Sequence, residues 1–136
     1  MPPLSPQDAL IYLMIVAASS DSAMTDRELG RAQALIAQLP VFEGYDHTRL
    51  PQVANECVDL INGAHDIEEV LEMALAAIPK RLQDTAYSLA VEITAVDLKL
   101  EQEELRLLEM VRDRLDLDRL TTAAIEAAAR ARYRKA

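Results

Sequence analysis

Apolar residues recur at helical spacing along nearly the whole chain and divide it into seven segments. Two of them, 5–20 and 80–96, contain "ALIYLMIVAA" and "AYSLAVEITAV" and are apolar on almost every face, which is typical of helices buried on all sides. The segments 25–39, 50–62, 66–78, 101–115 and 118–131 carry one apolar stripe each, as helices that cover a core do. The pattern therefore predicts an all-α bundle of about seven helices with two central ones.

Capping residues mark where several of these helices should begin. Ser5 precedes Pro6, which favours a serine N-cap with proline at the first helical position. Thr25 with Glu28 forms a capping-box pattern, and Asp66 stands where the fourth helix opens. The inward stripe of the second helix should be Leu29, Ala32, Leu35, Ile36 and Leu39. That of the seventh should be Leu120, Ala123, Ala124, Ala127 and Ala131.

The chain also repeats itself at an interval of 76 residues. Each copy is a buried helix, an aspartate at its end, a tight turn and an amphipathic helix with a glutamate in its first turn. The aspartates are Asp21 and Asp97, and the glutamates are Glu28 and Glu104. We interpret this as a helical hairpin present twice, at 5–39 and 80–115, within a single domain over residues 1–136.

The pattern Asp-x-x-apolar-x-x-x-Glu-Leu, given twice in an all-helical chain of this length, resembles the TerB family, which is named for tellurite resistance. The resemblance extends from about residue 5 to residue 128 and includes "PKRLQDTAYSLAVEITAVD", which is similar to the helix before that family's second acidic turn. It implies a TerB-like helical fold and a role in a stress response. It also implies a divalent metal at the paired acidic residues, Asp21, Glu28, Asp97 and Glu104.

The residues themselves leave two interpretations of the acidic turns open. As caps, the carboxylates would accept from the free N–H groups of the following helix and stabilise its positive dipole end. As ligands, they would bind Ca²⁺ or Mg²⁺, but each turn is too short for an EF-hand, so the two turns would have to pool their oxygens.

Charge and cysteine content narrow the function classes. The net charge is −9, with 23 acidic and 14 basic residues, which disfavours binding to a nucleic-acid backbone. The basic end "RARYRKA" is expected to be solvated and to complement the last helix. Cys57 is the only cysteine, which excludes an intrachain disulfide and favours a reducing cytoplasm. We expect neither a signal peptide, since the first residues lack a basic region, nor a membrane span, since the longest apolar run is too short.

The sequence therefore predicts a cytoplasmic TerB-like interaction or sensing module with a protein partner. We do not expect an enzyme, because His47 and His65 have no ligand-type spacing and Cys57 lies in an apolar stripe. The alternative is a structural helical scaffold or dimerisation domain without metal or catalytic activity. The sequence leaves homodimer formation open.

Overall fold

A computed structural model describes residues 4–18, 26–63, 65–95 and 102–136, with the side chains of 102–105 outside the description. These residues form helices and connections, and no strand occurs among them. The α-helices are α1 (Pro6–Ala18), α2 (Asp26–Gln38), α3 (Leu50–Asn62), α4 (Ile67–Ala76), α5 (Gln83–Ala95), α6 (Gln102–Arg114) and α7 (Arg119–Arg132). Short 3-10 turns cover Pro40–Phe42, His47–Arg49 and Lys80–Leu82. The predicted all-α class is confirmed.

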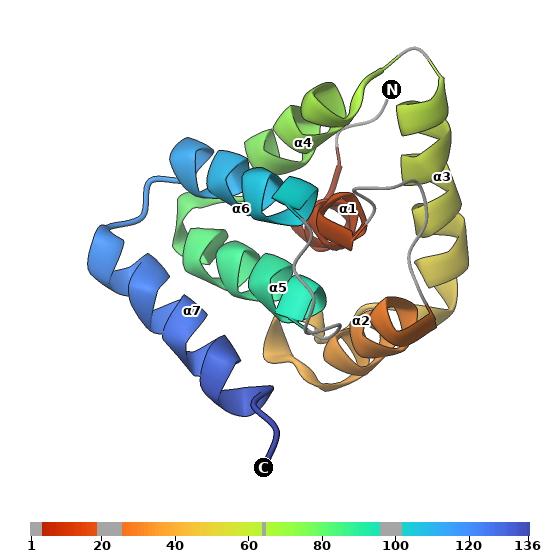
Figure 1. The fold of residues 1–136 in the computed structure, drawn as a ribbon. Helices are drawn as coiled ribbons and strands as arrows, with labels where there is room; N and C mark the ends of the chain where they lie inside the picture. Colours follow the sequence, from red (N-terminus) through yellow and green to blue (C-terminus); the bar gives the residue numbers. More distant parts are fainter. Residues whose placement is uncertain (1–3, 19–25, 64, 96–101) are drawn as a thin grey trace.

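Helix α1 is the centre of the bundle, as its apolar sequence predicts. Every residue from Ala9 to Ala18 is buried. Figure 1 shows α1 almost end-on, surrounded by the other helices, and it contacts α2, α3, α4, α5 and α6. A helix without a polar face satisfies its backbone internally, so burying it on all sides costs no hydrogen bonds and removes a large apolar area from water.

Helix α5 is the second central element, and it carries the outer helix α7. Its residues from Ala86 to Thr94 are buried, except for the partly exposed Ser88. The helix packs on α1 on one side and supports α6 and α7 on others. The segment preceding it begins as a 3-10 turn over Lys80–Leu82 rather than as the predicted α-helix. The turn follows Pro79, whose ring cannot continue α4.

The two helical pairs α1–α2 and α5–α6 have matching positions in the chain. Asp26 and Gln102 begin α2 and α6, and Gln38 and Arg114 end them, so both ends are 76 residues apart. The packing follows the same scheme, because α1 contacts α5 and α6 while α2 contacts both α1 and α5. Each amphipathic helix therefore covers both buried helices.

Several predicted caps are present. The Ser5 hydroxyl accepts from the Asp8 N–H at 3.1 Å, and an Asp66 carboxylate oxygen accepts from the Glu69 N–H at 2.8 Å. Helix α7 begins in the same way at Asp118. The predicted cap Thr25 lies outside the described residues.

Two predicted inward faces are wrong in part. In α7 the buried residues are Thr122 and Ala129, whereas Leu120 is 81% exposed and the four alanines assigned inward are exposed too. In a helix with so many alanines the apolar pattern barely distinguishes one face from another. In α2 the buried position of the first turn belongs to Glu28, and Leu29 is exposed.

A further search concerned membrane insertion. Within the described ranges, no helix combines the length and the apolar character that crossing a bilayer requires.

Candidate functional site

The structure describes the predicted metal ligands only in part. Asp21 and Asp97 lie outside the described residues, and Glu104 lies on α6 with its side chain outside the description. Glu28, in the first turn of α2, is 2% exposed. The part of the chain that is described contains no group of three or more histidine, cysteine or acidic side chains suited to a metal. The cation site at these four residues therefore stays a prediction.

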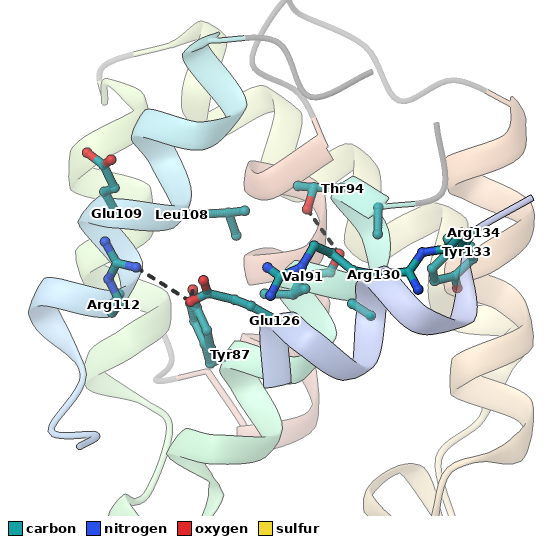
Figure 2. A pocket seen from close by; sticks show the side chains of 12 residues that line it. Tyr87, Val91, Thr94, Leu108, Glu109, Arg112, Glu126, Arg130, Tyr133 and Arg134 are labelled. Atoms are coloured by element: carbon teal, nitrogen blue, oxygen red, sulfur yellow. Dashed lines mark hydrogen bonds and ion pairs between the residues drawn. The ribbon is translucent and has the colours of Figure 1, made fainter. Parts of the chain in front are cut away.

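The described residues form a different candidate site, a cleft between α6 and α7 with α5 as its floor. We call it the α5–α7 pocket, and its volume is about 440 Å³. This size lies within the usual range for small-molecule sites. The floor and walls are mainly apolar, and charged side chains stand around the mouth (Figure 2). The lining residues are Tyr87, Val91, Thr94, Ala95, Leu108, Glu109, Arg112, Glu126, Ala129, Arg130, Tyr133 and Arg134.

One end of the α5–α7 pocket is closed by a polar bridge. The Tyr87 hydroxyl donates to Glu126 Oε2 at 2.8 Å, and Arg112 Nη1 lies 3.5 Å from the same oxygen. Figure 2 shows these side chains meeting across the gap between α6 and α7. Burial, followed by the hydrogen bond to Glu126, raises the pKa of Tyr87, so its hydroxyl is neutral at physiological pH. The bridge ties α6 to α7 and leaves the pocket closed at this end.

The other end is bordered by two cations of α7. Glu126, Arg130 and Arg134 follow one another at intervals of four residues, so they lie along one side of α7 and its C-terminal extension. Arg130 and Arg134 are both exposed. No carboxylate of the described residues forms an ion pair with either guanidinium. The charge of Glu126, in contrast, is already engaged by Arg112.

Below the pocket, a buried carboxylate fixes the end of α7. Glu92 of α5 accepts from the Tyr133 hydroxyl at 2.5 Å and from Arg31 Nη2 of α2 at 3.0 Å, and it also pairs with Arg132. Both guanidinium groups lie 5.8 Å from the centroid of the Tyr133 ring. We call Glu92, Arg31, Arg132 and Tyr133 the Glu92 network.

The Glu92 network also changes the acid–base properties of its members. Burial would lower the pKa of Arg31, but the hydrogen bond to Glu92 and nearby charges raise it. The pKa of Tyr133 is raised by burial and then by its bond to Glu92. Because Tyr133 also lines the α5–α7 pocket, the network holds one wall of the pocket in place.

Sequence reasoning missed both the pocket and the network. The basic end of the chain was expected to be solvated, yet Arg132 and Tyr133 turn back onto Glu92. A signal for the network exists in the sequence, since a lone glutamate inside the apolar stretch "AYSLAVEITAV" needs partners when buried. No comparable signal announces the pocket, because it depends on how far α6 and α7 stand apart on α5.

The other residues considered from the sequence lie away from the pocket. Cys57 is fully buried in α3, and burial raises its pKa to about 12, so it is a small apolar side chain rather than a nucleophile. His47 is exposed, and His65 Nδ1 lies 3.0 Å from Glu69 Oε2 on the surface.

Comparisons with known proteins complete the description. Models of protein families, curated proteins and solved structures gave no match to this chain. The resemblance to the TerB family and the function it implies therefore remain predictions, and the candidate site rests on the geometry of the described residues.

Proposed function

We propose that this protein is a cytoplasmic TerB-like sensing module, which binds a ligand in the α5–α7 pocket in a stress-response setting and reports it to a protein partner. The observation that carries the proposal is the pocket itself. A cavity of about 440 Å³ with an apolar floor and charged rim has the form of a ligand site, in which apolar surface provides affinity and a few polar groups provide orientation.

Binding without chemistry is the better interpretation of the groups at this site. General acid–base catalysis needs a group whose pKa lies near the working pH. The pKa of Tyr87 is raised, and its partner Glu126 already accepts from Tyr87 and faces Arg112. The charged groups of the closed end thus satisfy one another, as they would in a rigid wall.

The proposal is tested with the neutral dye Nile red, whose fluorescence rises in apolar sites. We expect the wild type to bind the dye and Leu108→Trp to lose binding, because the larger ring would fill the pocket from α6. The matched control is Leu120→Trp, since Leu120 is 81% exposed and does not line the α5–α7 pocket. Circular dichroism verifies that the variants fold. No dye binding by the wild type, or equal binding by Leu108→Trp, would refute the proposal.

A second candidate function is cation sensing at the acidic turns, and the burial of Glu28 favours it. A carboxylate so far from water needs compensating charge or several donors, and a divalent ion shared with Asp21, Asp97 and Glu104 would supply it. Thermal unfolding of EDTA-treated protein with and without Ca²⁺ or Mg²⁺ tests the idea. At a hundredfold excess over Kd, stabilisation of about 2.7 kcal/mol is expected.

The control for cation sensing is the double variant Asp21→Asn/Asp97→Asn, in which the ion-dependent shift should vanish. An equal shift in the variant would place the ion elsewhere. If neither dye nor cation changes the protein, the scaffold alternative is favoured, and Glu28 acts only within the fold.

A further inference from the structure

The shape of the α5–α7 pocket restricts the kind of ligand it takes. Its α5 floor runs from Tyr87 to Ala95, two helical turns, or about 12 Å at 1.5 Å per residue. This matches the extended length of decanoate. The central lining consists of aliphatic groups, including Val91, Leu108 and Ala129, and Thr94 Oγ1 donates to the Val91 carbonyl at 3.0 Å rather than facing a ligand unpaired. A saturated chain therefore fits the floor better than a polar ring.

The charges at the mouth restrict the head group. Arg130 and Arg134 stand one helical turn apart and line the pocket, and within the described ranges neither has an ion-pair partner. Two guanidinium groups at this spacing can bind a carboxylate through paired hydrogen bonds. Glu126 does not compete strongly for them, because it already faces Arg112 and accepts from Tyr87. The rim is therefore complementary to an anion.

The charge of the whole protein limits how many negative charges that anion carries. The chain has a net charge of −9, so its field repels anions and does so in proportion to their charge. The two arginines form a local exception on an acidic surface. A monoanion gains their attraction at the smallest long-range cost, whereas a nucleotide or polyphosphate pays several times more.

We propose that the ligand of the α5–α7 pocket is a free medium-chain monocarboxylate, a fatty acid of about the size of decanoate. Its chain lies on the floor between α6 and α7, and its carboxylate pairs with Arg130 and Arg134. This inference rests on the proposed function, because it names the ligand class of the same pocket. Arg112 and Glu126 close the far end and limit the length of the chain.

The test is displacement of Nile red from the full chain by decanoate and by its neutral analogue 1-decanol. We expect decanoate to bind more tightly than decanol. In Arg130→Gln/Arg134→Gln, we expect decanoate affinity to fall about tenfold, a change of about 1.4 kcal/mol, and decanol affinity to stay unchanged. The matched control is Arg27→Gln/Arg119→Gln, which removes two exposed arginines outside the pocket and should bind decanoate as the wild type does.

Three results would overturn the inference: equal affinity for decanoate and decanol, unchanged decanoate affinity in Arg130→Gln/Arg134→Gln, or binding to vesicles of anionic lipid without binding to free decanoate. The last would identify a membrane surface as the partner of the arginines. The dye separates this failure from that of the proposed function. If Nile red binds and Leu108→Trp abolishes its binding, the pocket is a site whose ligand is not a fatty acid. If Nile red does not bind at all, the proposed function fails as well.

Discussion

Replacing Glu92 by alanine should cost this protein about 3 kcal/mol of unfolding free energy. The carboxylate accepts from Tyr133 at 2.5 Å and from Arg31 at 3.0 Å, and hydrogen bonds to a charged group contribute roughly 1.5–3 kcal/mol each. The side chain of Arg31 is only 23% exposed, so its charge would lose compensation where water is scarce. Arg132 is 56% exposed and adds about 0–1 kcal/mol.

These contributions overlap, since the groups share one carboxylate, and about 3 kcal/mol is the total we expect. For a domain of this length, that corresponds to a fall in Tm of roughly 10 °C. Urea unfolding and thermal unfolding, both followed by circular dichroism, measure the change. Glu109→Ala serves as control, because Glu109 is exposed on α6 and its loss should cost less than about 0.5 kcal/mol.

A Glu92→Ala variant as stable as Glu109→Ala would refute the argument that the Glu92 network holds α7 on the bundle. A second check is the double-mutant cycle with Arg31→Ala. If the two residues interact as their distance indicates, the costs of the single changes add up to more than the cost of the double change. Additive costs would mean that the pair contributes no coupling energy.

Other predictions concern ionisable groups. The chain's four tyrosines, Tyr12, Tyr45, Tyr87 and Tyr133, all have raised pKa values, with that of Tyr12 at about 12, and burial is the main cause. The stability they confer is therefore fully present below the unfolded value of about 10 and lost as the pH rises through the raised values. Tyrosinate absorbance should appear together with alkaline unfolding, and a tyrosine that ionises earlier in the folded protein would contradict this. Cys57, with its pKa raised to about 12, should react with Ellman's reagent only after unfolding, so rapid reaction of the native protein would show that α3 opens. The pKa of Asp118 is lowered by its hydrogen bonds from Thr121, so its contribution is present above about 3.9 and lost as the pH falls through the lower folded value. The Asp118→Asn variant should therefore show a weaker loss of stability in acid, and an unchanged acid profile would argue against the cap.

The sequence allowed the helices to be predicted because each has a strong local signal. The uninterrupted apolar run of α1, the stripe of α3 and the caps at Ser5 and Asp66 appear in the structure where the pattern placed them. Such signals involve residues at most four positions apart, so they are present in the sequence itself.

The candidate site could not be predicted in this way, because its parts meet only through tertiary packing. Arg31 and Glu92 are 61 residues apart, and Tyr133 lies a further 41 residues along the chain from Glu92. A single sequence indicates that Glu92 needs partners, but not which of the 14 basic residues supply them. The alanine-rich α7 added an error of its own, since its weak periodicity placed Leu120 inside.

The central position of α1 also has a consequence for how the chain folds. The helix forms early in the sequence, yet many of its contacts are with α4 and α5, which follow more than 48 residues later. Until those helices have been synthesised, the apolar residues from Ala9 to Ala18 have nothing to cover them, and exposed surface of this kind promotes aggregation of nascent chains. Fragments that end after α3 should therefore be insoluble or chaperone-bound, and folding on the ribosome should begin only once α5 has emerged.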